Sequence, residues 1–323
     1  MQQEIRFATF NVCNLAPPGV KLYDNLLPTT PEEYEAKLDW TAHQLDLLDA
    51  DVIGFQEIFS QATLKDVLAR TYRYREAFHL GFDPDPAAMR LTPSVALVSR
   101  LPLAATAQAM VEFPRGIELP SGSRDAARFT RAPLHAVVSV SPDVMVDVVV
   151  VHLKSRRPDY RTGDTGEDPA LYALACLRSL IRRGTEAAAL RVLMTEMGRA
   201  NRRPRVLLGD FNDVADSVTT SIVLGAGTPL GDRLYDANQI QRADHARHLG
   251  FSSVHEGHYS TIDHILVSEE FNGALPNAIG EVIDVIYLND HLDLALPEAS
   301  DHGQVLARIR LYDEGHGLME AGV

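Results

Sequence analysis

Apolar segments that are too short for helices recur along the chain and are separated by short polar stretches. Residues 148–151 are four consecutive valines, and such β-branched runs are typical of strands that are covered on both faces. The same pattern, with polar residues at its ends, predicts strands elsewhere. The expected strands are residues 5–10, 51–56, 95–99, 134–140, 145–153, 205–208, 261–267 and 304–311.

Two segments have a helical pattern instead. The first begins at Thr30, whose hydroxyl can cap a helix, and Glu33 follows three residues later, as in a capping box. The next positions recur at steps of three and four, which places them on one helical face: Tyr34, Leu38, Thr41, Leu45 and Leu48. The second helix is expected over residues 169–199, with Gly184 as a point where it could be interrupted.

The composition indicates one large α/β domain over residues 1–323. A chain with 46% hydrophobic residues can bury a large core, and strands recur almost to its end. The formal net charge is −14, which argues against a protein that coats long nucleic acid, because such binding depends on many Lys and Arg contacts to phosphate. A short anionic substrate held by a local basic cluster remains compatible with this charge.

The chain has no sequence features of export or of membrane insertion. It has no apolar run of about 20 residues, so no membrane span is expected. Its first residues lack a signal-peptide pattern, and its two cysteines, Cys13 and Cys176, are too few for a disulfide framework. We therefore expect a cytoplasmic protein with reduced thiols, although a removed leader would leave the same sequence.

Polar residues of catalytic types follow several of the predicted strands. The strand 205–208 continues into Gly209-Asp210-Phe211-Asn212. Strand alternation would point Asp210 and Asn212 to the same side, where a carboxylate and a carboxamide could activate a water beside a phosphoryl oxygen. The alternative is an Asx turn that closes the strand.

Two more candidates lie at the ends of the first two strands. Glu57 follows strand 51–56 and is a candidate ligand for Mg²⁺ or Mn²⁺, which prefer carboxylate oxygen. Its structural alternative is a carboxylate favoured by the dipole of a following helix. Asn11 could bind a phosphate or orient a metal ligand, or it could be an ordinary turn residue.

The last candidates come from three distant segments. Ser300-Asp301-His302 opens the last strand and combines a possible metal ligand, Asp301, with a possible proton-transfer group, His302. Asp263 lies in an apolar strand, so its charge needs a partner, and a histidine held in one tautomer would supply it. His152 ends the valine-rich strand and could donate to a phosphate oxygen or be a core histidine.

In this order, the motifs resemble those of the endonuclease/exonuclease/phosphatase superfamily, the deoxyribonuclease-like metal-dependent phosphoesterases. The similarity covers nearly the whole chain. It implies a four-layered α/β sandwich in which two packed mixed β-sheets are flanked by helices, with the site at the shared edge of the sheets. The matching segments are 9–11, 51–57, 151–155, 208–212, 262–265 and 300–302.

The resemblance also implies roles for these residues. Glu57 would hold the catalytic Mg²⁺ or Mn²⁺, with Asn11 and Asp301 as ligands or close neighbours. Asp210 would orient or deprotonate the attacking water. Asn212 and His152 would stabilise the charge on phosphorus. His302, oriented by Asp263, would contact the phosphoryl group or transfer a proton.

Two departures put particular subfamilies in doubt. Abasic-site endonucleases carry an acidic residue two positions after the first asparagine, where this chain has Cys13. Inositol-polyphosphate phosphatases have a Trp-Cys-Asp-Arg signature where this chain has residues 261–264. The resemblance therefore predicts the reaction class but not the substrate.

Two segments rich in glycine, proline and charge, 114–131 and 156–169, are expected to be long loops, which are often functional. Both are locally basic, and arginine binds phosphate in a bidentate manner, so some of these residues could dock the substrate. The alternative is that they form ion pairs with nearby acidic residues of the loops. The substrate-binding candidates are Lys154, Arg156, Arg157 and Arg128, with Arg115, Arg124, Arg131 and Arg161 close by in sequence.

The sequence thus predicts a hydrolase that attacks a phosphate ester with water, a phosphodiesterase or phosphatase acting on a small or short anionic substrate. The first alternative is an endonuclease or exonuclease on DNA or RNA, and the second is a binding module that has lost catalysis. A zinc site on the late histidines, which include His245, His248, His255 and His258, is a further alternative to an exposed polar loop. No pattern indicates the oligomeric state.

Overall fold

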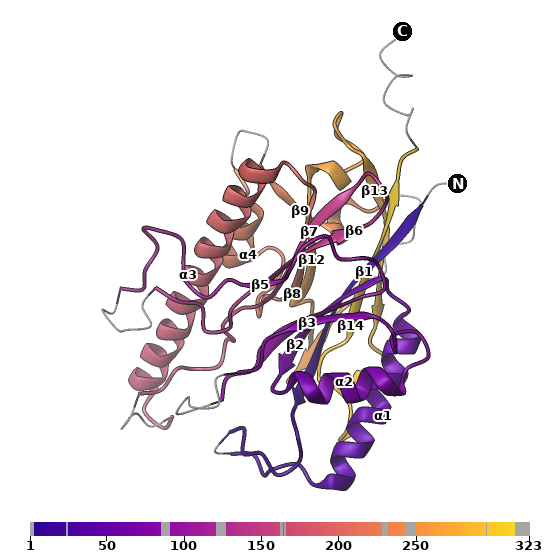
Figure 1. Cartoon of the computed structure of the whole chain (residues 1–323). Coiled ribbons are helices and arrows are strands. Elements are labelled where there is room, and N and C mark those ends of the chain that lie inside the picture. Colours follow the sequence, from indigo (N-terminus) through magenta and orange to yellow (C-terminus); the bar gives the residue numbers. More distant parts are fainter. Residues whose placement is uncertain are drawn as a thin grey trace.

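The computed structural model describes residues 3–23, 25–84, 91–120, 127–161, 164, 166–227, 232–242, 250–294 and 296–313 (Figure 1). Within these residues, each of the eight expected strands and both expected helices is present, and further short strands and helices lie between them. Two six-stranded sheets carry most of the strands, and β10 (Ser253–His255) and β11 (His258–Ser260) form a separate hairpin.

The first sheet combines both ends of the chain. Its strand order is β13-β14-β1-β2-β4-β3, in which β1 and β2 run parallel and the other neighbours run antiparallel. The last strand therefore lies beside the first, which brings the 300–302 motif next to the first asparagine. The strands are β1 (Glu4–Leu15), β2 (Val52–Ile58), β3 (Phe78–Gly81), β4 (Ser94–Ser99), β13 (Gly280–Leu288) and β14 (Gln304–Leu311).

The second sheet comes from the middle of the chain. Its order is β5-β6-β7-β8-β12-β9, and here β7 and β8 are the parallel pair. Both sheets are therefore mixed. The strands are β5 (Gln108–Ala109), β6 (Leu134–Ser139), β7 (Met145–His152), β8 (Arg205–Asp210), β9 (Leu234–Asp236) and β12 (Asp263–Ser268).

Helices cover the outer face of each sheet, so the molecule has four layers (Figure 1). On the first sheet, α1 (Pro31–Leu48) and α2 (Gln61–Arg70) pack over an apolar cluster built on β1 and β2. On the second, α3 (Pro169–Asn201) and α4 (Val218–Leu224) cover β7 and β8. Short helical segments complete the described chain: α5 (Ala237–Ile240), η1 (Glu269–Phe271) and η2 (Asp290–Asp293).

The inner faces of the two sheets pack directly on each other. This central core contains fully buried side chains from both sheets, among them Phe7 and Val150. The sheets approach closely at Gly54 of β2, where a Cβ atom would lie only 2.9 Å from Cβ of Leu208 in β8. Only glycine fits such a contact. It brings β2 and β8 together shortly before Glu57 in β2 and Asp210 in β8.

The predicted four-layered sandwich is confirmed, with adjusted boundaries. The capping box at Thr30 is present, since its hydroxyl accepts from the Glu33 amide and the Glu33 side chain accepts from the Thr30 amide. Gly184 does not interrupt α3, which is continuous over 33 residues, because this glycine keeps helical backbone and leaves open space beside it. Both cysteines are free thiols, as expected.

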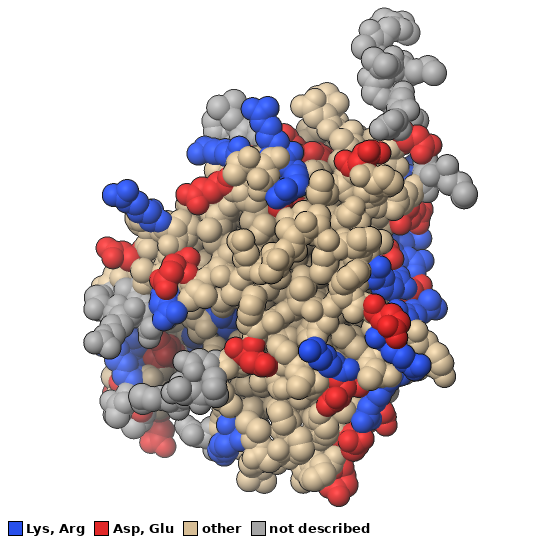
Figure 2. Space-filling view, viewed as in Figure 1, with Lys and Arg blue, Asp and Glu red and all other residues tan. Residues whose placement is uncertain are grey.

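Charged residues of both signs are interspersed on the face shown in Figure 2. Blue and red side chains alternate around a broad area of other residues rather than separating into one basic and one acidic region. Among the described helices, none combines the length and the apolar character that crossing a bilayer requires.

Candidate active site

The predicted site residues meet at one edge of the sandwich because of the strand directions. The parallel pair β1 and β2 ends at this edge in one sheet, and the parallel pair β7 and β8 ends there in the other. The antiparallel neighbours β12 and β14 begin at the same edge. Six strand ends therefore supply the residues of the site: Asn11, Glu57, His152, Asp210, Asp263 and His302.

Two adjacent strands lose their regular pairing at this edge. The register between β1 and β2 shifts after Asn11, and that between β2 and β4 shifts after Phe55. Cys13, Asn14 and Glu57 adopt left-handed backbone, with φ values of 52°, 58° and 63°. Such conformations are costly outside glycine and are concentrated at functional sites, and bulges of this kind re-aim side chains.

The bulges fix the Glu57 carboxylate in place. Its Oε2 accepts from the amide of Asn14 at 3.0 Å, and its Oε1 lies 3.4 Å from Nδ2 of Asn11. The side chain is half-buried, while Oδ1 of Asn14 is buried without a hydrogen-bond partner among the described residues. A half-buried carboxylate beside an unpaired amide oxygen forms an oxygen-rich corner at the edge of the site.

Asp210 lies at the centre of the cluster and is 1% exposed. Its Oδ1 accepts from the amide of Asn212 at 2.7 Å, and its Oδ2 accepts from Nδ2 of Asn11 at 3.1 Å. His152 approaches Oδ2 at 3.4 Å. Burial, and the charge of neighbouring Asp263, raise the pKa of Asp210 to about 7.

The prediction that strand alternation places Asn212 beside Asp210 is only partly right. Strand β8 ends at Asp210, and Asn212 has left-handed backbone with φ 52°, so strand alternation does not continue through it. The short contact from its amide to the Asp210 carboxylate is the Asx turn that was considered as the alternative. The turn nevertheless keeps Asn212 beside the site, where its Nδ2 donates to the carbonyl of Leu153 at 3.1 Å.

His302 and Asp263 form the predicted pair. Nδ1 of His302 lies 2.8 Å from Oδ2 of Asp263, which is fully buried, and Nε2 of the same ring faces Oδ2 of Asp210 at 3.9 Å. Burial would lower the pKa of His302, but the charge and hydrogen bond of Asp263 outweigh it and raise that pKa well above its ordinary value. Asp263 thus favours the protonated form of the ring whose Nε2 faces Asp210.

His152 differs from His302 in its electrostatics. It is 3% exposed, and no described group hydrogen-bonds its Nδ1. Burial lowers the pKa of His152 well below its ordinary value, and the positive charge of Arg131 adds to the effect. Two imidazoles with opposite pKa shifts thus approach the same oxygen, Oδ2 of Asp210.

Asp301 lies on the same side of the molecule as Glu57. Burial raises the pKa of the Cys13 thiol, and the charges of Asp301 and Glu57 act on it in the same direction at close range. Lys37 of α1 also lies near the Cys13 thiol, and its Nζ donates to the carbonyl of Ala299 at 3.4 Å. Carboxylates from two distant segments therefore meet around Cys13.

The donor set fits a hard divalent cation. Carboxylate and carboxamide oxygens are the ligands that Mg²⁺ and Mn²⁺ prefer. Glu57 is half-buried and Asp301 is exposed, whereas Asn11 is 1% exposed and its Oδ1 accepts from the amide of Cys13 at 3.1 Å. Atoms of Asp210, Asp263 and His302 also lie within 4.8 Å of one another, so this buried group could hold a metal ion. Within this group, Asp263 and His302 are hydrogen-bonded to each other.

The predicted substrate-binding residues are spread over two loops and differ in their contacts. Arg128 is exposed and is paired with Glu112 at 3.1 Å, and Arg156 is paired with Asp213. Nζ of Lys154 donates to the carbonyls of Ser155 and Arg157, each at 3.3 Å, and so supports the loop itself. Among the described residues, the guanidinium of Arg157 has no partner.

Sequence reasoning did not identify several residues that position the site. Ser300 donates to the carbonyl of Asn11 at 2.6 Å and accepts from the amide of His302 at 3.0 Å. Ser252 accepts from the amide of Asp263 at 3.1 Å. Ser300 was within the recognised motif, whereas nothing in the pattern around Ser252 distinguishes it from other loop serines.

Some expected residues fall elsewhere. His255 and His258 lie on the exposed β10–β11 hairpin, facing each other across its turn, while His245 and His248 lie outside the described residues. Arg124 also lies outside them.

The fold agrees with the outcome of comparison with known proteins. Residues 8–302 match the endonuclease/exonuclease/phosphatase family, so the chain belongs to that family. Members of this family are phosphoester hydrolases. A search of curated proteins gives no match.

Solved structures share the fold at low sequence identity. A family protein from Bacteroides thetaiotaomicron is 17% identical, with a TM-score of 0.60 over 98% of each chain. The human Nocturnin catalytic domain is 15% identical, with a TM-score of 0.60 over 96% of this chain and 98% of that one. A mannosyl-6-phosphatase from Bacteroides thetaiotaomicron is 17% identical, with a TM-score of 0.56 over 94% of this chain and 99% of that one.

Proposed function

We propose that this protein is a Mg²⁺- or Mn²⁺-dependent phosphoesterase that hydrolyses a small or short phosphate ester by attack of water on phosphorus. The observation that supports it most is the convergence at Asp210, a buried carboxylate that receives neutral amide donors and faces a protonated histidine. Among the structures of similar fold, the mannosyl-6-phosphatase is named for a small phosphate monoester.

Asp210 is suited to take the proton of the attacking water. A general base works best when its pKa is near the working pH, and burial raises the pKa of Asp210 to about 7. Asn11 and Asn212 donate to its two oxygens and so hold the carboxylate in one orientation. Their amide groups are uncharged, so they orient the base without making it a much weaker one.

His302 is suited to stabilise the phosphoryl oxygens or the departing oxygen. Asp263 keeps it protonated and fixes the ring, and a preorganised positive donor is worth most in a buried site. His152 and Asn212 also lie beside Asp210, where neutral donors would contact the phosphoryl oxygens. Protonated and neutral donors are thus both present beside Asp210.

Glu57, Asn11 and Asp301 would hold the divalent cation. When bound, the cation would neutralise negative charge that develops on the phosphate and on the leaving oxygen. Asn14 adds an unpaired buried oxygen to the same corner. The half-buried position of Glu57 leaves this corner open to a phosphate that arrives from solvent.

Arg156 and Arg157 are proposed to dock the anionic substrate at the rim. Arg156 is 56% exposed although it is paired with Asp213, and Arg157 has no partner among the described residues. Charge reversal at both positions should raise KM for an anionic substrate several-fold and change kcat little, because the rim does not touch the reacting atoms. An unchanged KM would eliminate this docking role.

The function is tested with a substrate panel. Bis-aryl phosphate, aryl phosphate, plasmid DNA and a single-stranded oligonucleotide are assayed with Mg²⁺ or Mn²⁺ and with EDTA. We expect EDTA-sensitive hydrolysis of an aryl phosphate ester, lost in His302→Ala and retained in His258→Ala, an exposed histidine on the hairpin. Cleavage of nucleic acid alone would favour the nuclease, and no hydrolysis of any substrate would refute the phosphoesterase.

A further inference from the structure

A cavity of about 320 Å³ opens at the same edge of the sandwich, one strand away from the catalytic residues. One wall of the cavity comes from the start of β4 in the first sheet. The other comes from the start of β6 in the second sheet and from the segment before it, which includes Ala109 and Val111. In the strand register, Ser94 pairs with Ile58, the residue after Glu57, and Leu134 pairs with Val150, two residues before His152. The cavity therefore continues the active site sideways by about one strand spacing of ~5 Å.

One wall of the cavity is preformed around a buried glutamine. Gln61, 7% exposed, donates through Nε2 to Oγ of Ser94 at 3.0 Å and to the carbonyl of Phe82 at 3.3 Å. Its backbone amide donates to Asp83 at 2.7 Å. Ser94 in turn donates to the carbonyl of Ile58 at 2.9 Å, so this wall is tied to the segment that carries Glu57.

The opposite wall is tied to the catalytic centre through Arg131. Its Nη1 donates to the carbonyl of Leu153 at 3.3 Å, the same carbonyl that accepts from Asn212. Its Nε is buried without a hydrogen-bond partner among the described residues. Thr130 has its amide held by Glu186 at 3.0 Å, while its hydroxyl is likewise unpaired.

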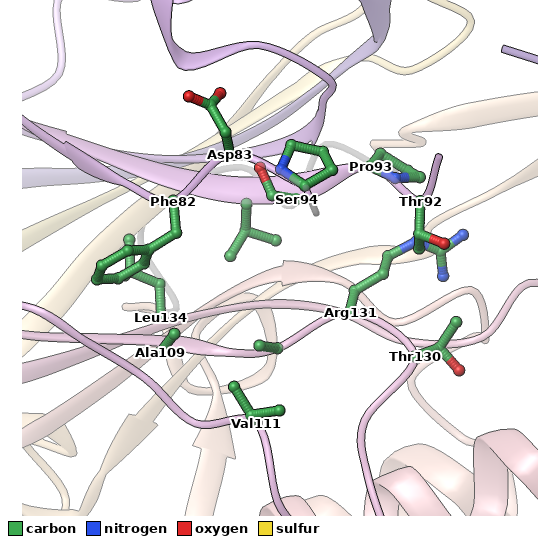
Figure 3. Close-up of a pocket in the computed structure, with 13 residues that line it drawn as sticks. Phe82, Asp83, Thr92, Pro93, Ser94, Ala109, Val111, Thr130, Arg131 and Leu134 are labelled. Atoms are coloured by element: carbon green, nitrogen blue, oxygen red, sulfur yellow. The ribbon is translucent and has the colours of Figure 1, made fainter. Parts of the chain in front are cut away.

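The lining separates into an apolar part and a polar part (Figure 3). The ring of Phe82 lies toward Leu134 and Ala109, whereas Arg131 extends toward Thr92. Arg131 is the one cationic side chain among the described lining residues. Its positive charge reaches the catalytic centre, since it contributes to the lowered pKa of His152.

We propose that this cavity binds a ring-sized apolar group of the phosphate-ester substrate, with Arg131 contacting the phosphate at its inner end. The inference rests on the phosphoesterase function proposed above. A cavity of about 320 Å³ lies at the small end of the range for small-molecule pockets, which suits one ring rather than a long chain. One cationic side chain opposite an apolar wall suits a ligand that is apolar at one end and anionic at the other.

The test compares two non-hydrolysable ligands that share a phosphonate head, benzylphosphonate and methylphosphonate. Binding to the full chain is measured by calorimetry with saturating Mn²⁺. Burial of the ring should make benzylphosphonate bind about 10- to 100-fold more tightly than methylphosphonate. Arg131→Gln should weaken both ligands by a similar factor, because both carry the anionic head.

A matched pair of variants places the same ring inside and outside the cavity. Ala109 lines the cavity, and Gln108 beside it in β5 is exposed and is not part of the lining. Ala109→Phe should remove the preference for benzylphosphonate and leave the affinity for methylphosphonate unchanged, whereas Gln108→Phe should leave both unchanged. Val111→Phe is a second filling variant if Ala109→Phe lowers the thermal stability.

Equal affinities in the wild type, or a preference that survives both filling variants, would overturn the proposal for the cavity. If the substrate panel shows hydrolysis in that case, the phosphoesterase function stands without it. If neither phosphonate nor inorganic phosphate binds in the presence of Mn²⁺, and no ester is hydrolysed, both proposals fail together. The affinity ratio and the hydrolysis assay therefore separate the two failures.

Discussion

The parallel strands β7 and β8 carry a buried aspartate near each end of the pair, and the two aspartates have opposite surroundings. Asp147 near the start of β7 is fully buried, with Nε2 of His135 at 2.8 Å and two nitrogens of Arg203 each at 3.0 Å. Asp210 at the end of β8 is equally buried, yet its closest donors are the uncharged amides of Asn212 and Asn11.

Their pKa values shift in opposite directions for this reason. Burial alone would raise the pKa of Asp147, but His135 and Arg203 outweigh it and lower that pKa below its ordinary value. At Asp210, burial and the charge of Asp263 prevail and raise the pKa to about 7. A buried carboxylate paired with cations stabilises the fold, whereas one paired mainly with amides keeps its basicity for chemistry.

Asp210→Asn should have the largest effect and should act on catalysis. Loss of the base is expected to lower kcat by about 10³-fold, within the usual range for general-base catalysis. Stability should be unchanged or higher, because the substitution removes a buried charge that lacks a full cationic partner. Steady-state kinetics and urea unfolding measure the two effects, and a stable variant with wild-type kcat would contradict the assignment.

Glu57→Gln should have the next largest effect and should act on the cation. Removal of the negative charge is expected to weaken Mn²⁺ binding by at least about 10-fold, a loss seen even for groups that only support a ligand. Calorimetric titration with Mn²⁺ measures it without reference to activity. Unchanged affinity in this variant, together with a loss in Asp263→Asn, would move the metal to the Asp210, Asp263 and His302 group.

Asp147→Asn should act on stability instead of catalysis. The variant leaves Arg203 without its carboxylate, and the loss of charge-assisted hydrogen bonds should lower the free energy of unfolding by about 2 kcal/mol. The partial exposure of Arg203, 30%, keeps the effect below that of a fully buried pair. Its kcat, corrected for folded protein, should stay within a factor of about two of the wild type; a catalytic defect as large as that of Asp210→Asn would remove the distinction.

The smallest predicted effect is the pH dependence of this stabilisation. Because the folded pKa of Asp147 is lowered, its contribution is present in full above the unfolded pKa of about 4 and is lost as the pH falls through the folded value. The stability difference between wild type and Asp147→Asn should therefore shrink as the pH falls below about pH 4. A difference that instead grew on acidification would show that the carboxylate is not stabilised in its charged form.

The resemblance to a known family implies the sandwich, whereas the strands and the candidate residues at their ends follow from the apolar pattern. Each catalytic candidate ends or begins a recognisable apolar run, and parallel strands bring such ends to one edge. The pairing of Asp263 with a histidine was predicted from the cost of burying its charge, and His302 is that partner. These inferences need only strand order and local chemistry.

The remaining features depend on tertiary contacts that a local pattern does not encode. Arg131 is one of several loop arginines, and only the packing of β6 against β4 places it in the cavity. Arg128, which looks equivalent in sequence, is paired with Glu112 on the outside. Left-handed backbone at Glu57 likewise arises from the shifted pairing of β2 rather than from a glycine or asparagine that could be read in advance.

The measurement that tests the central assignment most directly is hydrolysis of an aryl phosphate ester in ¹⁸O-labelled water, with Mn²⁺ and purified full chain. If Asp210 activates water at the phosphorus, the label appears in the phosphate product, EDTA abolishes the reaction, and Asp210→Asn loses it while Asp147→Asn retains it. Label in the released alcohol, or hydrolysis that Asp210→Asn leaves intact, would contradict the assignment.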